Sequence, residues 1–520
     1  MIAAEAPARA ALLELRHARR HNHREAVHWV DAIYRVYVGA LVALVVVFAG
    51  TAVFGDQQIT AEAAHDFAAS ATPWLGLAFA LALAVGLRSG ARGGPLTLQS
   101  ATVQHELLAP IDPGFVLREP ALKQVRFFAF VGACVGGVAA MTGVRQLPTN
   151  PVIFVGGAAL AGAAAAVLAL GVAMIFSGRR IPLLIANALA LAVLGWSVVD
   201  IVAKTATSPM TWLGSLATAA ITFNPLALVT LAAAVAVIPV ALNGIGGISI
   251  DDARRRAGLV SQLRFAVTLQ DIRTVVLLRR QLAQETPRAK PWVPLKRGGR
   301  APAVWRRDWR CYFRFPLVRV GRLVVFGFVA GIGLGVTWHG VRPAFLISAL
   351  ALYLAGYDAV EPLAQEIDHP SRWDGMPRDH GILLLTHLPA AFFVMLLVCL
   401  IGSASALIMV PASVVLSLSS LLLWVVALAA VAGAALSTVM GAPDMSKMMA
   451  GLGADVMGFV MLFRLVFPYA ITVAALAPIF RAGVTVDALD LDKAQTVTGY
   501  TVLLAGGAIA YVRFQKPTRV

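Results

Sequence analysis

Two acidic segments, 105–120 and 361–377, share a pattern of charged residues and prolines. Each has an Ile-Asp pair one or two residues ahead of a proline and ends near a further proline. Aspartate followed by proline is typical of a helix start, because the carboxylate caps the first turn and proline fits within it. We therefore predict a helix of about two turns in each segment, over 112–120 and 368–377. Such a helix is a stiff, exposed lever.

The histidines and cysteines do not form a complete metal site. His17 and His21 share one helical face at the i, i+4 spacing, but no nearby carboxylate or cysteine completes a ligand set. Cys134, Cys311 and Cys399 are far apart and form no Cys-x-x-Cys motif, so neither zinc nor a disulfide framework is expected. We predict that the chain itself binds no metal and no cofactor.

The motifs of common catalytic centres are absent from the sequence. There is no G-x-x-x-x-G-K-[ST] phosphate loop and no LSGGQ-like signature, so the chain does not bind ATP by that route. H-E-x-x-H and G-x-S-x-G are also missing. Asp56, Glu62 and Asp66 could be the metal-binding acids of a lipid-linked sugar transferase, but such enzymes usually need a larger outer domain. We predict no catalytic residue and no enzymatic activity of the chain alone.

One basic residue, Arg464, lies deep inside an apolar stretch. Charge within a membrane is costly, so such a residue usually faces protein, water or an acidic partner. A structural ion pair or a helix cap is one interpretation, and a place in a substrate path is the other. Asp358, at a comparable depth, is the candidate partner.

The composition predicts a membrane protein. Of 520 residues, 59% are hydrophobic and 13% charged, and the mean hydropathy is +0.78. Soluble proteins have about 45–50% apolar and about 25% charged residues, so an ordinary soluble enzyme is excluded, as is a disordered chain. The net charge of +16 would suggest nucleic acid in a soluble protein. Here we expect the charge to follow membrane topology, and we predict no nucleic-acid partner.

The fold class that follows is an all-α polytopic membrane protein. A span needs roughly 20 mostly apolar residues. Residues 208–222 are too short to span and are expected to form an outer half-helix or to lie at the interface. About twelve apolar stretches are long enough: 33–54, 70–88, 125–144, 152–176, 182–202, 224–246, 317–338, 342–360, 382–404, 409–435, 457–479 and 495–513.

The distribution of lysine and arginine between the loops predicts how these spans are oriented in the membrane. Most of the 43 basic residues fall in loops on one side, and that side is expected to be the cytoplasm, with both termini. The spans then divide into two parallel six-helix repeats, each preceded by a basic, aromatic stretch suited to the headgroup layer. The predicted divisions are an N-terminal interfacial helix (1–32), a first half (33–246), a basic cytoplasmic linker with amphipathic and interfacial helices (247–316), a second half (317–513) and a cytoplasmic tail (514–520).

The chain resembles the permease subunit of ABC-2 type exporters, in the fused twelve-span form common in actinobacteria. The resemblance rests on residues 94–110 (GPLTLQSATVQHELLAP), 362–368 (PLAQEID) and 383–389 (LLLTHLP), and on a coupling loop between the second and third span of each half. It implies a protein of the bacterial cytoplasmic membrane that exports a lipophilic or amphiphilic substrate by alternating access. No second permease chain is needed, because both halves are present.

The resemblance also implies partners. Two copies of a separate cytoplasmic ABC ATPase would dock beneath the two acidic loops and supply ATP and Mg²⁺, with the lipid bilayer as the other partner. The residues expected to couple the permease to that ATPase are Glu106, Asp112, Arg118, Glu119, Glu366, Asp368, Arg372 and Asp374.

Two other functions stay open at this stage. A proton-coupled secondary transporter of the major facilitator kind also has six plus six spans and a long cytoplasmic middle segment. Its link between the second and third spans is usually short, whereas here residues 89–124 form that link. A polytopic lipid-linked glycosyltransferase is the less favoured alternative.

Overall fold

The computed structural model is helical throughout the part of the chain that it describes, where no strand occurs, and it divides into two units, 1–262 and 263–520. Each unit is considered by itself. The described residues are 9–18, 58–98, 101–268, 287–295, 302–338, 344–368, 379–410, 412–441, 463–464, 466–477 and 491–514, with isolated positions between 39 and 51 and between 274 and 282.

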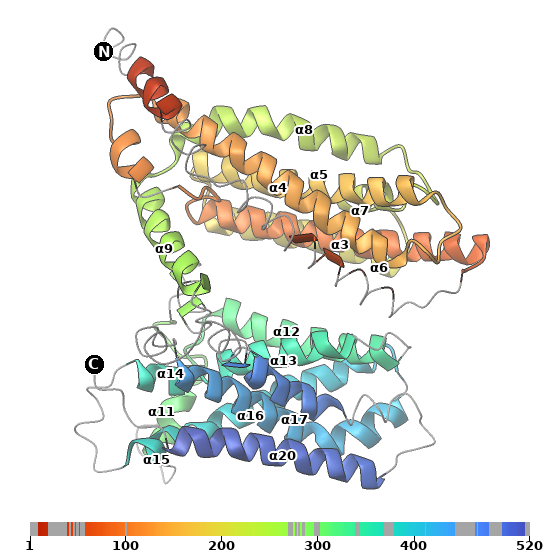
Figure 1. Cartoon of the computed structure of the whole chain (residues 1–520), viewed down its shortest axis with the longest axis vertical. Helices are drawn as coiled ribbons and strands as arrows, with labels where there is room; N and C mark the ends of the chain where they lie inside the picture. The colour runs from red at the N-terminus through yellow and green to blue at the C-terminus, as the bar shows by residue number, and fades with distance from the viewer. Residues whose placement is uncertain are drawn as a thin grey trace. The chain divides into compact units, whose positions relative to one another are not determined.

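In unit 1, long helices run side by side around α5 (Figure 1). The helix α5 packs against α3, α4, α7 and α8, and most of its apolar window is buried. A helix over 9–18 precedes these elements. The others are α3 (Ala61–Ala91), η1 (Thr102–Glu106), α4 (Pro113–Gly143), α5 (Pro151–Gly178), α6 (Leu183–Ala203), α7 (Pro209–Ala217), α8 (Ala227–Gly244), η2 (Ile245–Gly247) and α9 (Ile250–Thr268).

Small residues let α4 and α5 of unit 1 approach each other closely. A Cβ atom at Gly132 or Gly136 of α4 would overlap the carbonyl oxygen of Gly162 or Ala158 of α5. Within a bilayer, where apolar burial does not drive helices together, such close backbone approach is a main source of attraction. The Gly/Ala-rich sequence of α4 and α5 therefore determines which helices form the centre.

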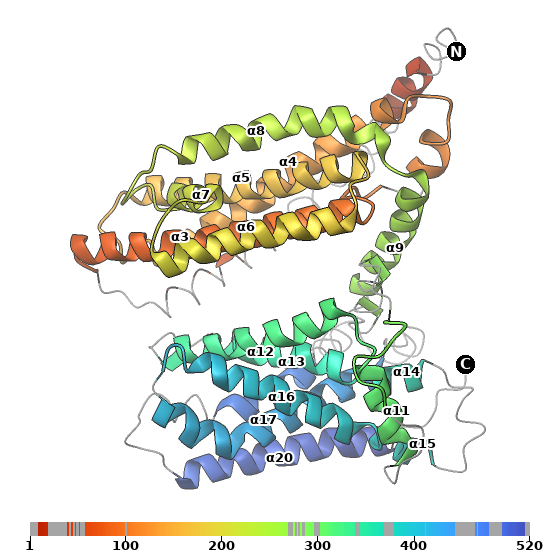
Figure 2. The same cartoon turned by 180° about the vertical axis from the view of Figure 1, so that it is seen from behind.

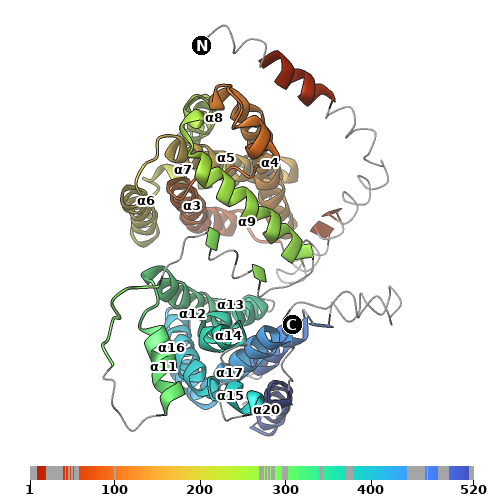
Figure 3. The same ribbon diagram turned by 90° about the vertical axis from the view of Figure 1, so that its left-hand side faces the viewer.

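In unit 2, α17 occupies the central position and packs against α13, α16 and α20 (Figure 2). Seen along the bundle, α11, α14 and α15 lie together at one end, which we call the α11 end (Figure 3). A short apolar helix over 466–477 also belongs to this unit. The labelled elements are α11 (Ala303–Tyr312), α12 (Leu317–Trp338), α13 (Ala344–Ala359), α14 (Glu361–Ile367), α15 (His380–Leu385), α16 (Leu388–Ala406), α17 (Ala412–Met440) and α20 (Leu491–Phe514).

Eight helices of the described part are long and apolar enough to cross a membrane. They are α3, α4, α5, α6, α8, α12, α15 with α16, and α17, and each lies where a span was predicted. A ninth is obtained if α13 and α14, which meet at a 54° bend, count as one span. The predicted span 495–513 coincides with α20, which is not among the eight, and only 466–477 represents the span predicted over 457–479. The span 33–54 falls almost wholly outside the described residues, so a total of twelve remains a prediction.

The structure corrects both predicted loop helices. Residues 112–120 do not form a separate short helix but begin the 31-residue α4, which continues through Pro120. The predicted cap itself is confirmed, because the Asp112 carboxylate accepts a hydrogen bond from Phe115 N at 3.0 Å. In the second loop Asp368 ends α14 instead of starting a helix. Most of the helix predicted over 368–377 lies outside the described residues.

Part of the segment 247–316, which was expected to be a cytoplasmic linker, is docked in unit 2. Arg288 N and Trp292 N donate to the carbonyl oxygens of Arg314 and Phe313 at 2.9 and 2.8 Å, and Trp292 Nε1 donates to Phe315 O at 2.9 Å. The Arg288 guanidinium lies 3.6 Å from the centre of the Trp292 ring. Residues 287–295 thus form a strap across the junction of α11 and α12.

Candidate functional site

A polar network at the α11 end of unit 2 joins α12 to the bend between α13 and α14. Arg319 of α12 is buried, and its Nε donates to Asp358 Oδ1 at 3.1 Å while its Nη2 donates to Glu361 Oε2 at 2.7 Å. Asp358 lies in the last turn of α13 and Glu361 in the first turn of α14. One guanidinium therefore holds both sides of the 54° bend.

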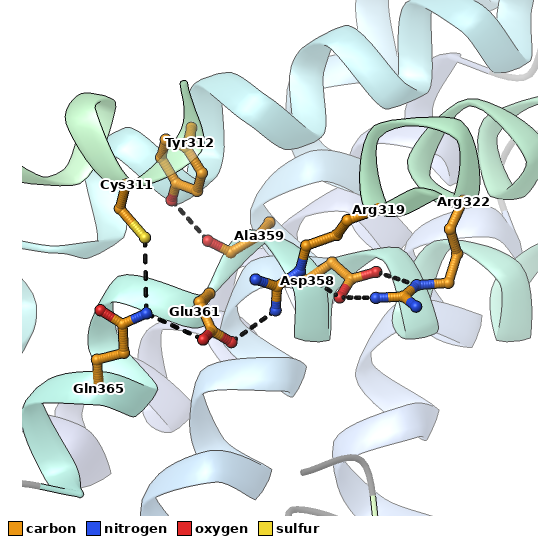
Figure 4. A network of polar contacts seen from close by, with 8 residues as sticks. All are labelled: Cys311, Tyr312, Arg319, Arg322, Asp358, Ala359, Glu361 and Gln365. Atoms are coloured by element: carbon orange, nitrogen blue, oxygen red, sulfur yellow. Dashed lines mark hydrogen bonds and ion pairs between the residues drawn. The ribbon is translucent and has the colours of Figure 1, made fainter. Parts of the chain in front are cut away.

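Figure 4 shows how the network continues on both sides of Arg319. Arg322 donates from Nε to Asp358 Oδ2 at 2.6 Å and from Nη2 to Asp358 Oδ1 at 2.7 Å, so the Asp358 carboxylate lies between two guanidinium groups. On the other side, Gln365 Nε2 donates to Glu361 Oε1 at 3.0 Å. Two cations and two anions give the network no net charge, which lowers the cost of burying it.

A second buried pair ties α11 to α16 at the same end. His387 Nδ1 lies 2.9 Å from each carboxylate oxygen of Asp308, and both side chains are almost fully buried. His387 Nε2 has no hydrogen-bond partner among the described residues. Burial raises the pKa of Asp308 above its ordinary range, and the hydrogen bond with His387 offsets this only in part. Next to this pair, Arg307 forms an ion pair with Glu366 of α14, whose side chain is also buried.

The raised pKa of Asp308 predicts a pH dependence. A folded state that holds this proton more tightly than the unfolded chain is favoured at low pH and loses that advantage as the pH rises through the folded pKa. We expect the free energy of unfolding of the wild type, relative to Asp308→Asn, to fall as the pH rises above about 4. Thermal unfolding of the detergent-solubilised proteins between about pH 4 and pH 8 measures this difference. A difference that grows with pH would contradict the raised pKa of Asp308.

Unit 1 has a corresponding ion pair. Arg16, in the helix over 9–18, lies with its Nη2 2.8 Å from Glu106 Oε2 and its Nη1 3.1 Å from Glu119 Oε2. The same Nη2 donates to Val116 O at 2.9 Å. The Arg9 guanidinium lies 5.2 Å from the centre of the Phe115 ring. The helix over 9–18 is thereby fastened to η1 and to the start of α4.

The eight residues expected to couple to a partner are divided by the structure into three groups. Asp112, Arg118 and Asp368 are exposed. Glu106, Glu119 and Glu366 pair with arginines of their own unit, and Glu106 and Glu366 are buried. Arg372 and Asp374 lie outside the described residues.

The pairing expected between Arg464 and Asp358 is wrong. Arg464 Nη2 donates to Met440 O at 2.7 Å and to Gly441 O at 3.2 Å, which satisfies carbonyl groups at the end of α17. Asp358 is held by Arg319 and Arg322. Of the two interpretations of Arg464, the helix cap describes these contacts.

Sequence reasoning missed Asp200, a fully buried carboxylate at the end of α6. Its Oδ1 accepts from Thr207 N at 3.0 Å, Thr207 Oγ1 at 2.6 Å and Thr205 Oγ1 at 3.0 Å. Its Oδ2 accepts from Ser208 N at 2.8 Å and Thr211 Oγ1 at 2.7 Å. These bonds fix the start of α7, which lies within the expected half-helix 208–222 and packs against α3, α5 and α8. The Ser/Thr-rich run after an isolated acid was the available signal.

Sequence reasoning also missed Arg319 of the polar network and Asp308 of the buried pair with His387, although the helical periodicity of the sequence marks both residues. Arg319 shares a face of α12 with the buried Leu323 and Gly327, at the i, i+4, i+8 spacing. Asp308 shares a face of α11 with Tyr312, four residues later, and both are buried. In each case the interior face of an apolar or amphipathic helix carries a charged residue, which predicts a buried partner.

No family model, curated protein or solved structure matches the chain. Among the described residues no group of three or more His, Cys, Asp or Glu side chains could hold a metal ion. The arrangement of the polar residues is therefore the basis for assigning a function. It can transmit a mechanical displacement, because one ion-paired assembly connects α11, α12, α13 and α14.

Proposed function

We propose that the chain is the membrane-spanning permease of an ATP-driven ABC exporter, which moves a lipophilic or amphiphilic substrate out of the cytoplasm or the inner leaflet by alternating access. In this proposal ATP is hydrolysed by two copies of a separate ATPase, on the side where α4 begins and α14 ends. The proposal rests on the resemblance in residues 94–110, 362–368 and 383–389 and on one structural observation.

That observation is the brace found in each unit. In both units an arginine of a short helix that precedes long apolar helices pairs with a buried glutamate in the segment expected to couple to the ATPase. The pairs are Arg16–Glu106 in unit 1 and Arg307–Glu366 in unit 2. A charged lever transmits force only if its base is held rigidly, and burial of the glutamate makes each attachment costly to break. The two braces support one lever in each unit, at the start of α4 and at the end of α14.

The packing within each unit also supports a parallel repeat. Counted with the predicted spans, α5 and α17 are both the fourth of their half. Each packs against the second, third and sixth helices of its half, which are α3, α4 and α8 for α5, and α13, α16 and α20 for α17. Two halves of one chain would then supply both sides of a translocation path.

In this proposal, a displacement spreads through the contacts of unit 2. A force on Asp368, at the exposed end of α14, reaches Glu366 and Glu361 within the same short helix. The ion pair of Glu366 with Arg307 then transmits the force to α11, and the ion pair of Glu361 with Arg319 transmits it to α12. Because Arg319 also holds Asp358, α13 moves with them. Docking of the ATPase at the exposed end of α14 thus moves helices that are expected to cross the membrane.

The proposal predicts that charge reversal of exposed lever residues releases the ATPase. We expect Asp368→Arg and Arg118→Glu each to weaken copurification of an ATPase by about tenfold or more, because like charges in an interface cost several kcal/mol. The protein is purified from its native membranes, and the bound ATPase is identified by its Walker and LSGGQ motifs. Asp112 is a poorer choice, because its side chain caps α4.

Glu62→Arg is the matched control, since Glu62 is an exposed acid at the opposite end of unit 1, and it should retain the ATPase. Recovery of no ATPase with the wild type would contradict the proposal. The buried Asp308–His387 pair favours the alternative of proton-coupled transport, because buried acids and histidines are typical of proton relays. That alternative predicts efflux without ATP that is abolished by a protonophore and by Asp308→Asn.

A further inference from the structure

Unit 2 contains an apolar pocket with a free volume of about 40 Å³. A single water needs roughly 10–15 Å³ on this measure, so the pocket has room for about three water-sized groups. The described lining is mostly hydrocarbon, with one thiol, one hydroxyl and the indole ring of Trp338. Residues that characterise it are Leu334, Leu352, Cys399, Ser403, Ala406 and Leu476.

The pocket lies away from the α11 end. Its α12 and α16 residues, Leu334 and Ala406, lie in the halves of these helices distant from Arg319 and His387. On α17, which runs in the opposite direction to α16, the lining residue Leu423 lies toward the helix start. The pocket therefore extends from the middle of the bundle, where Leu352 and Val426 lie, toward the end opposite the charged network, which is the outer end in the expected orientation.

We propose that this pocket binds the end of a straight alkyl chain. An apolar cavity offers water too few hydrogen bonds to hold it, and such cavities stay dry and accept apolar guests. Each methylene group transferred from water contributes about 0.8 kcal/mol. Small residues, Gly331, Gly402 and Ala406, form part of the wall, which leaves space for a narrow chain. The chain belongs either to a bilayer lipid or to a transported amphiphile, and only the second source rests on the proposed function.

Cys399 makes the pocket measurable, because its thiol is part of the lining. Two variants of the full chain are needed, one that keeps only Cys399 and one that keeps only Cys134, an exposed cysteine on α4. Both are reconstituted in bilayers and treated with N-ethylmaleimide, with and without 1-hexanol. At about ten times its Kd, hexanol should slow the labelling of Cys399 about tenfold, because only the empty fraction reacts, and should leave the labelling of Cys134 unchanged.

A variant in which a larger side chain fills the pocket provides the second test. Ala406→Leu places a larger side chain in the wall and should remove the effect of hexanol on Cys399. Ala404→Leu makes the same change two residues away on an exposed position of α16 and should preserve the effect. Ser403→Leu is the substitute if Ala406→Leu does not fold. Photolabelling with a diazirine derivative of hexanol, mapped to 330–338 and 399–406, reports on binding even if the maleimide does not reach the thiol.

The lipid composition separates the two sources of the chain. If a bilayer lipid fills the pocket, Cys399 reacts slowly in bilayers of linear acyl chains and faster in bilayers of methyl-branched phytanoyl chains. If the pocket binds a transported amphiphile instead, the rate of Cys399 labelling is the same in both bilayers and falls only with hexanol. Either result supports the proposal, and the first does so even if no ATPase binds. Labelling that responds to neither lipid nor hexanol, together with photolabel spread evenly over unit 2, would overturn it.

Discussion

Replacing Asp358 by asparagine is expected to destabilise unit 2 by about 3–5 kcal/mol, because the buried guanidinium of Arg319 and the partly buried guanidinium of Arg322 both lose the anion that they share. Both oxygens of Asp358 accept hydrogen bonds, Oδ1 from Arg319 Nε and Arg322 Nη2, and Oδ2 from Arg322 Nε. The amide NH₂ of asparagine would therefore face a donor in either orientation. Thermal unfolding of the purified protein, followed by size-exclusion chromatography of heated samples, measures the loss, which corresponds to a midpoint lower by on the order of 10 °C.

The same substitution at Asp379 is the control for Asp358. Asp379 pairs with Arg513 at a more exposed position of unit 2, and exposed ion pairs contribute about 0–1 kcal/mol. Glu361→Gln should lie between the two, since Arg319 keeps Asp358 when Glu361 is neutral. If Asp358→Asn and Asp379→Asn unfold at the same temperature, the network does not hold the bend between α13 and α14.

Asp200→Asn is expected to have the second large effect, a loss of about 3 kcal/mol, because hydrogen bonds to a charged group contribute about 1.5–3 kcal/mol each and do not add fully. Each carboxylate oxygen accepts a backbone N–H, Thr207 N on Oδ1 and Ser208 N on Oδ2. Asparagine can accept only one of them, and its NH₂ then opposes the other. We expect α7 to lose its attachment, which limited proteolysis of the loop after α6 will detect as faster cleavage.

Thr211→Val is the graded control for Asp200, because it removes one of the five hydrogen bonds and leaves the carboxylate in place. It should cost about 1 kcal/mol. Asp66→Asn, at an exposed position of α3, should have no measurable effect on stability or cleavage. Cleavage after α6 that is equally slow in Asp200→Asn and Asp66→Asn would show that α7 is held by its packing alone.

Most spans of the described part were predictable because their signal is local. A run of about 20 apolar residues is long enough for a bilayer whatever the rest of the chain does. The positions of α5 and α12 in the sequence therefore matched the prediction closely. The loop helices did not, because the Asp-Pro pair at 112–113 specifies where α4 begins but contains nothing that ends a helix nine residues later. Proline at 120 was tolerated inside α4.

The buried polar residues were harder to predict than the spans. The sequence places Glu106 and Glu366 in charged loops, where exposure is the ordinary expectation. Their burial depends on arginines 90 and 59 residues away in the chain, Arg16 and Arg307. The choice of Arg319 and Arg322 over Arg464 as partners of Asp358 depends in the same way on how α12 lies against α13.

The amino-acid sequence alone predicts the all-helical character of the chain, where most of its long apolar helices lie, and which segments carry the charge. These properties follow from composition and from runs of neighbouring residues. The free energy of exposing apolar groups to water or polar groups to lipid is roughly a sum over individual residues. Only the tertiary structure decided which charges are braces and which are exposed, and where unit 2 leaves a pocket beside Cys399. Ion pairs and cavities depend on distances of a few ångströms between distant residues, and packing alone sets those distances.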